Sequence, residues 1–124
     1  RKFQGQSFVH HKADAAQWSS FRLPGFVSRD TEIADHTANV AGVHVVRPNS
    51  GVTEWTHHRC DILFTFVMEG RMVLEGSDRD PVELAPGDAF VIPPGMATRY
   101  RAVDDDLELL EVSLPGVFET ILSR

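Results

Sequence analysis

The sequence predicts a single all-β domain, a sandwich or barrel of short strands, and three observations support this fold class. Short apolar runs recur along the chain from Thr31 onward. Turn residues, mostly proline and glycine, separate these runs at intervals of roughly 8–12 residues. No helical segment lies between the runs, as a parallel α/β fold would require. The 124 residues are enough for one domain with one core.

The expected strands follow one another between turn signals. Residues 41–47 end at the turn Pro48–Gly51, and residues 62–68 end at Glu69-Gly70. Residues 72–74 come directly after that glycine, so we expect them to form a hairpin with 62–68. Each later strand also ends before proline and glycine, and these strands are 81–84, 89–92 and 107–112.

The segment 62–68 is apolar on both of its faces. Strand alternation directs Ile62, Phe64, Phe66 and Met68 to one side and Leu63, Thr65 and Val67 to the other. We therefore expect a central strand, buried between two sheets or between a sheet and a partner subunit.

The first 28 residues form an expected N-terminal arm, and residues 29–124 form the barrel. Residues 12–18 are compatible with a short helical turn, and Leu23–Phe26 is a turn signal. The arm is rich in large apolar side chains, which are Phe3, Phe8, Val9, Trp18 and Phe21. We therefore expect a two-fold homodimer with the arm at the interface.

Charge and cysteine content limit the function classes. The net charge of −6 and the scattered distribution of 12 lysines and arginines argue against a nucleic-acid partner. Cys60 is the single cysteine, so no internal disulfide forms and the cytoplasm is the expected compartment. No signal peptide or membrane-spanning run is visible, although a chain that starts at Arg1 leaves a lost leader or an upstream domain open.

Two segments combine glycines and prolines at turn positions with motif residues between them. The first, Gly51–Gly70, resembles a motif in which a glycine leads to a His-x-His pair, a glutamate and a strand closed by glycine. The second, Pro86–Tyr100, resembles a motif that runs from Gly-Asp through Pro-x-Gly to a histidine. Together with the flanks 42–48 and 106–112, these segments resemble the small single-domain proteins of the cupin superfamily. The resemblance implies a jelly-roll barrel, the double-stranded β-helix of that superfamily.

The resemblance also implies a metal site, from which this sequence departs. In the family, two histidines and a glutamate of the first motif and a histidine of the second hold one metal, commonly iron, manganese, nickel or zinc. Here Leu63 stands at the glutamate position and Thr98 at the second histidine position. The histidine pair has two registers, one that places His57 and Arg59 there and one that places Thr56 and His58 there.

The residues themselves support at most a weak metal site that involves His57 and His58. These neighbours point to opposite faces of an extended segment, and a catalytic site needs about three converging ligands. His58 with Asp61, or His57 with His44, remains a way to bind a divalent transition metal. In the other register, Arg59 would suit an anionic ligand.

The expected ligand-binding residues are those that strand alternation directs into the barrel. They are His44, His58, Leu63, Thr65, Thr98, Tyr100 and Glu111. His44 is alternatively a hydrogen-bonded core residue, and Cys60 is expected to be a small buried side chain. Because one of two carboxylates must lie among apolar residues, we expect Glu108 to face solvent or a salt bridge and Glu111 to lie in the pocket.

The sequence leaves the catalytic residues and the ligand open. We expect a barrel that binds or senses a small apolar or weakly polar organic molecule. The alternatives are a dioxygenase, isomerase or lyase with unusual metal ligands, and a sensor domain of a larger regulator.

Overall fold

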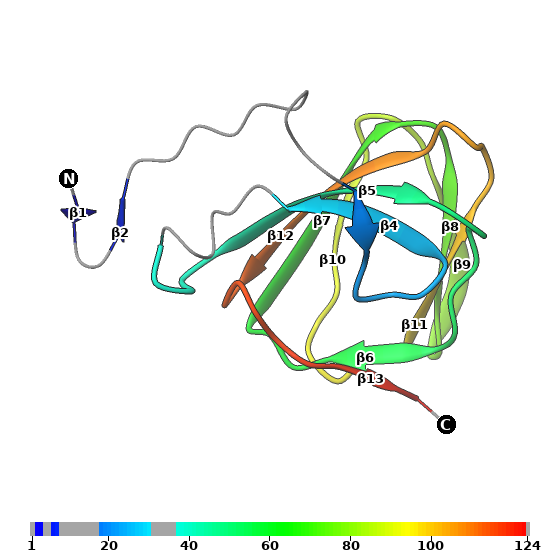
Figure 1. Ribbon diagram of the computed structural model, residues 1–124. Helices are drawn as coiled ribbons and strands as arrows, with labels where there is room; N and C mark the ends of the chain where they lie inside the picture. Colours follow the sequence, from blue (N-terminus) through cyan, green and yellow to red (C-terminus); the bar gives the residue numbers. More distant parts are fainter. Residues whose placement is uncertain (1, 4–5, 8–17, 31–36, 124) are drawn as a thin grey trace.

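The computed structural model describes residues 2–3, 6–7, 18–30 and 37–123, which form three antiparallel sheets (Figure 1). Strands β1 (Lys2–Phe3) and β2 (Gln6–Ser7) pair with each other. The six-stranded sheet has the order β10-β7-β12-β5-β4-β3 and the five-stranded sheet the order β13-β6-β11-β8-β9. No helix occurs in the described part of the chain, which confirms the all-β jelly-roll prediction.

The bounds of the strands agree with the turn residues of the sequence. The six-stranded sheet consists of β3 (Ser19–Ser20), β4 (Phe26–Asp30), β5 (Gly42–Pro48), β7 (Ile62–Glu69), β10 (Ala89–Val91) and β12 (Glu108–Leu114). The five-stranded sheet consists of β6 (Thr56–His58), β8 (Met72–Gly76), β9 (Arg79–Leu84), β11 (Thr98–Ala102) and β13 (Thr120–Leu122).

The expected hairpin between residues 62–68 and 72–74 is wrong. Strand β7 pairs with β10 and β12, whereas β8 pairs with β9 and β11 in the opposite sheet. The connection passes through Gly70, whose φ of 70° is a left-handed conformation. A Cβ atom there would lie 2.7 Å from the Leu107 backbone. Glycine therefore lets the chain cross to the other sheet in close contact with that backbone.

The two faces of β7 differ in burial. Leu63, Thr65 and Val67 are each at most 1% exposed and point into the barrel. The neighbouring Phe64 and Phe66 point outward and are half-buried. The strand lies second from the edge of its sheet, between β10 and β12, and its outer apolar face is partly open to solvent.

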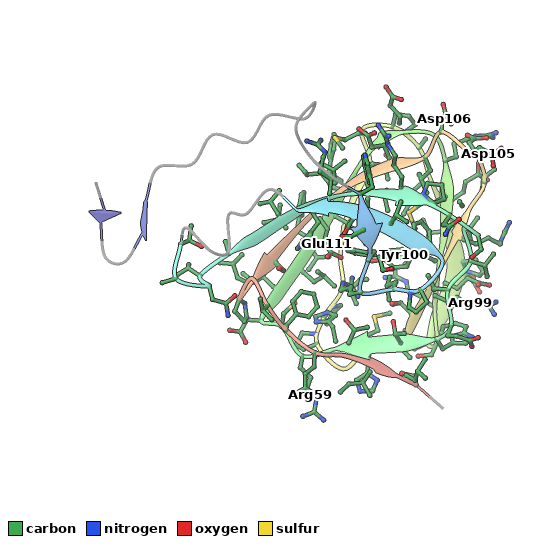
Figure 2. All side chains as sticks on the ribbon, viewed as in Figure 1. Arg59, Arg99, Tyr100, Asp105, Asp106 and Glu111 are labelled. Atoms are coloured by element: carbon green, nitrogen blue, oxygen red, sulfur yellow. The ribbon has the colours of Figure 1, made fainter. Side chains whose placement is uncertain are left out.

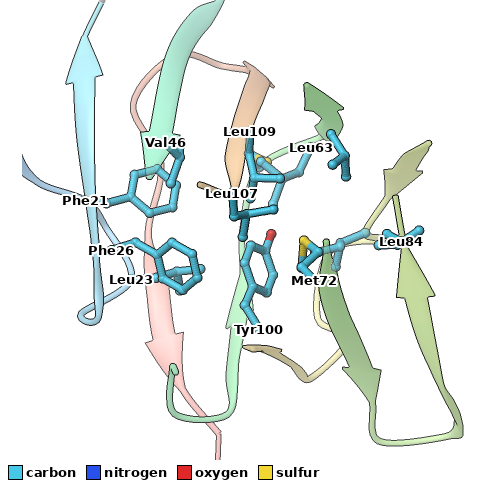
Figure 3. Close-up of a cluster of buried hydrophobic side chains, with 13 residues drawn as sticks. Phe21, Leu23, Phe26, Val46, Leu63, Met72, Leu84, Tyr100, Leu107 and Leu109 are labelled. Carbon is cyan, nitrogen blue, oxygen red and sulfur yellow. The ribbon is translucent and has the colours of Figure 1, made fainter. Parts of the chain in front are cut away.

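The hydrophobic core fills the space between the two sheets, and the segment before β5 contributes to it. Phe21, Leu23 and Phe26 join Tyr100, Met72 and the other core side chains (Figure 3). Phe21 of the predicted arm thus lies in the core of its own chain. Residues 12–17 of the helical turn expected at 12–18 and the side chains of Phe3, Phe8 and Val9 lie outside the described residues. The boundary at residue 28 and the arm's place at an interface stay predictions.

The described part of the chain has no helix that is long and apolar enough to cross a membrane.

Candidate functional site

The site begins with three neighbouring strands that direct polar side chains inward. Glu111 on β12 lies opposite His44 on β5 and opposite Thr65 on β7. Because strand partners in register point to the same face, these three side chains form a row across the barrel interior. Figure 2 shows Glu111 and Tyr100 within the barrel.

Arg22, which lies between β3 and β4, forms an ion pair with Glu111. The Arg22 Nη2 atom lies 2.5 Å from Glu111 Oε1, and Nε lies 3.2 Å from both carboxylate oxygens. Arg22 Nη1 also donates to Thr120 Oγ1 at 3.2 Å. The side chains of Arg22 and Glu111 are only 17% and 3% exposed. Burial is the largest single effect and disfavours the charged guanidinium, but the charges and hydrogen bonds of Glu111 and Tyr100 together outweigh it and raise the Arg22 pKa.

Two aromatic rings enclose the Arg22 guanidinium. Its central carbon lies 5.0 Å from the Phe21 ring centroid and 5.2 Å from that of Phe118. Both distances allow cation–π attraction. The cation is therefore held in place by a carboxylate, a hydroxyl and two rings.

An open pocket of about 260 Å³ lies over this ion pair, and we call it the mouth pocket. Its lining includes Phe21, Arg22, Ser28, His44, Glu111 and Phe118. The His44 and Phe21 rings meet edge to face, with centroids 6.3 Å apart. The pocket thus combines aromatic walls with a polar floor.

His58 points into the barrel below the mouth pocket, and both of its ring nitrogens make hydrogen bonds. Because a carbonyl oxygen only accepts, His58 Nε2 donates to Ile92 O at 2.6 Å. Its Nδ1 atom then accepts the Cys60 backbone N–H at 3.2 Å. Burial lowers the His58 pKa, and the bond to Ile92 opposes this effect only in part. His58 is consequently a neutral imidazole with both nitrogens occupied.

Tyr100 and Thr65 place two further hydroxyl groups in the interior. The Tyr100 hydroxyl lies beside Arg22 and Thr65, and burial raises its pKa to about 12. Neither hydroxyl makes a hydrogen bond of favourable geometry within the described residues.

The positions that the family uses for metal binding converge on a narrow space, which we call the inner space. Thr56, His58, Leu63 and Thr98 all line it, together with Arg22 and Tyr100. His57 also borders this space, but Arg59, its partner in the other register, is exposed and does not, so the structure favours the register that places Thr56 and His58 at the histidine positions. The inner space is too narrow for a water molecule.

The donor set of the inner space does not suit a transition metal. Leucine offers no ligand, the threonines offer only hydroxyl groups, and both nitrogens of His58 are hydrogen-bonded. Among the described residues, no three His, Cys, Asp or Glu side chains come together as a metal site.

The predicted pair of His57 and His58 does not converge. His57 borders the inner space but is only half-buried, and its Nδ1 atom lies 2.7 Å from Ser123 Oγ, outside the lining of that space. The alternating directions of β6 explain the separation. Asp61 is exposed, and therefore cannot complete a site with His58 inside the barrel.

The structure separates the other predicted residues into two groups. His44 and Glu111 face the mouth pocket, whereas His58, Leu63, Thr98 and Tyr100 surround the inner space. Thr65 lies beside Glu111 in the register. Their role in ligand binding stays a prediction.

The structure also tests the expectations for Arg59, Cys60 and Glu108. Arg59 extends away from the barrel and cannot hold an anion inside it (Figure 2). Cys60 is buried as expected, and burial raises the pKa of its thiol to about 11. Glu108 forms the expected salt bridge, which Arg47 provides at 2.8 Å.

Sequence reasoning missed Arg22, which contacts Glu111, Thr120 and two aromatic rings. Strand alternation would direct Arg22 away from the buried side of Phe21 and Leu23, so the local pattern gave no signal for an inward arginine. Residues 22–23 form a bend instead of a strand, and Arg22 there meets Glu111, 89 residues away.

A second pocket, of about 190 Å³, lies between the edge strands β9 and β10, and we call it the edge pocket. It is mainly apolar and is lined by Leu74, Val82, Leu84, Phe90, Ile92 and Met96.

Comparisons with known proteins agree with this architecture. A family model described as a cupin domain matches residues 42–113. No curated protein matches the chain.

Among solved structures, the polyketide cyclase RemF from Streptomyces resistomycificus is similar at 18% identity and a TM-score of 0.79, covering 95% of this chain and 87% of that one. KdgF from Halomonas sp. is similar at 22% identity and a TM-score of 0.68, covering 85% and 93%. A sugar phosphate isomerase from Silicibacter pomeroyi is similar at 21% identity and a TM-score of 0.68, covering 85% and 74%. At these identities the likeness establishes a shared fold.

Proposed function

The chain belongs to the cupin family, and we propose that it binds a small, weakly polar organic molecule in the mouth pocket. The observation that carries this proposal is a buried ion pair at the floor of an open pocket with aromatic walls. Arg22 and Glu111 neutralise each other, so the floor favours a ligand without a strong net charge. It offers hydrogen-bond donors and acceptors to a hydroxyl or carbonyl group.

The walls favour a flat ligand. Phe21 and Phe118 flank the floor from two sides, and His44 adds a third planar ring. Aromatic faces of this kind pack well against another ring. The ligand class is therefore a small planar compound with one or two oxygen substituents.

A fluorescence titration with 2-naphthol tests this proposal, because the probe is planar and carries one hydroxyl group. We expect saturable binding that Phe118→Ala weakens at least about tenfold, the effect of about 1.4 kcal/mol. The matched control is Phe90→Ala, which alters the edge pocket instead. Binding that is lost in Phe90→Ala and kept in Phe118→Ala would place the site in the edge pocket and contradict the proposal.

An enzyme is the second candidate, and the pairing of His44 with Glu111 in the same pocket favours it. An imidazole that faces a ligand can accept and return a proton near neutral pH. If so, the protein accelerates exchange of the acidic C–H hydrogens of 2-tetralone in heavy water, as measured by NMR, and His44→Gln abolishes the acceleration. Metal-dependent catalysis would instead require ligands beyond the side chains described above.

The homodimer remains a proposal, and the outer face of β7 and β12 is its best-supported contact surface. Phe64, Phe66, Leu110 and Val112 form one apolar patch on neighbouring strands. A second copy would cover this patch around a two-fold axis. We expect light scattering to report a dimer for the wild type and a monomer for Phe66→Asp, with Val82→Asp on the other sheet as the control. A monomeric wild type would contradict the proposal.

The remaining expectations concern cellular context. We propose a cytoplasmic location, which a chain with one cysteine and no internal disulfide supports, and cell fractionation tests it. A sensor domain within a larger regulator would use the same mouth pocket, and the full gene product would distinguish that case.

A further inference from the structure

The inner space contains one residue that the family motifs do not supply. Four of its lining residues stand at the family's metal-ligand positions, and none of them carries a charge. Arg22 reaches the same space from the segment before β4, outside the matched residues 42–113. It is the single charged side chain among the residues that line the inner space.

We propose that the Arg22 guanidinium is the fixed cation of this barrel and takes the place that the family gives to a metal ion. Glu111 anchors it with hydrogen bonds of 2.5 and 3.2 Å, and Thr120 anchors its other end. Phe21 and Phe118 close over its faces. The inference is independent of the ligand proposed for the mouth pocket.

The electrostatic effects of Arg22 agree with a cation at this position. Its charge lowers the pKa of His58, Cys60 and Tyr100, in each case as a smaller effect than burial. All three groups surround the inner space or adjoin it. Glu111 shifts the same three pKa values in the opposite direction and less strongly, so the positive end of the ion pair dominates at the inner space.

A guanidinium in this place excludes a metal ion. Two cations a few ångströms apart repel each other strongly in a partly buried site. Moreover, the guanidinium remains charged at every physiological pH and does not dissociate. The N-terminal segment, which carries Arg22, is consequently part of the site.

The first experiment restores metal ligands in two backgrounds. Both variants carry Leu63→Glu and Thr98→His, which would add two ligands beside His58. The first variant keeps Arg22 and Glu111. The second also carries Arg22→Met and Glu111→Gln. Calorimetric titration with Zn²⁺ measures the affinity. We expect the background without the ion pair to bind Zn²⁺ at least about 100-fold more tightly, because the repelling guanidinium lines the inner space, whereas the Glu111 carboxylate that is removed with it does not. Equal affinity in the two backgrounds overturns the proposal.

The second experiment uses a single substitution, so it tests the proposal even if the multiply substituted variants do not fold. Arg22→Ala leaves the Glu111 carboxylate without its cation. We expect low millimolar guanidinium, or Zn²⁺, to raise the melting temperature of Arg22→Ala or to induce its folding. The same cations should leave wild type and Arg22→Ala/Glu111→Gln unchanged, and Arg71→Ala serves as the control at an exposed ion pair. If neither cation acts on Arg22→Ala, or if Zn²⁺ acts equally on wild type, the proposal is wrong.

Discussion

The inside and the outside of this barrel use the same kinds of side chain with different consequences. Arg22 and Glu111 form an ion pair inside, where the side chains are 17% and 3% exposed. Arg71 and Asp104 form one outside, where they are 50% and 32% exposed. Water screens the outer pair and solvates each partner if the other is removed, whereas the inner pair depends on its own contacts. The lesson is that burial, rather than residue type, decides what a charge contributes here.

The largest expected effect comes from the inner ion pair. Arg22→Met leaves a buried carboxylate unpaired and should lower the free energy of unfolding by about 3–5 kcal/mol. Adding Glu111→Gln should recover much of that loss, because no unpaired charge remains. Urea denaturation measures both variants, with Arg71→Met as the outer control. If Arg22→Met lowers the free energy of unfolding no more than Arg71→Met does, the contrast between the inner and outer ion pairs is wrong.

A matched pair of leucines extends the comparison to apolar side chains. Leu63 is 1% exposed inside the barrel, and Leu122 on β13 is 59% exposed. Leu63→Ala should destabilise the protein by about 2–5 kcal/mol, since it leaves a cavity in the core. Leu122→Ala should cost less than about 1 kcal/mol. Thermal melts of the two variants test this, and similar shifts would refute the assignment of inner and outer faces.

The two neighbouring histidines give a comparison in pH. The folded-state pKa of His58 lies below its ordinary value of 6.5. As pH falls below about 6.5, His58 is protonated in the unfolded chain but not yet in the folded protein. The free energy of unfolding therefore decreases as pH falls below about 6.5. His58→Gln keeps a donor for Ile92 O and should flatten the decrease between about pH 7 and 5. Melting curves at each pH measure the slope, and an unchanged slope in His58→Gln contradicts the prediction. His57→Gln, at the half-buried neighbour, is the control.

The smallest effect is expected at the outer ion pair. The hydrogen bonds and charge of Arg71 lower the Asp104 pKa. The ion pair between Arg71 and Asp104 therefore stabilises the folded protein at pH values above the ordinary carboxyl pKa of about 3.9. This stabilisation is lost as pH falls through the lower folded-state pKa of Asp104. Asp104→Asn should change the melting temperature only slightly at pH 7, and 1 M salt should remove the difference. A large, salt-insensitive loss would contradict the screening argument.

Much of the fold was predictable from local pattern. Turn residues placed the strands, and alternation correctly assigned Leu63 and Thr65 to one face of β7. The departure from the family's ligands at Leu63 and Thr98 was also visible in the sequence. These features depend on residues that are close together in the sequence, so the alternation of side chains along a strand is enough to predict them.

The tertiary structure decided the rest. It directed β7 and β8 into different sheets, chose Thr56 and His58 as the inward pair, and brought Arg22 to Glu111 across 89 residues. Local pattern contains no information about which distant strand will lie opposite a given side chain. The charge centre of this barrel is created when the sheets close, because only then do a carboxylate and a guanidinium leave water and depend on each other.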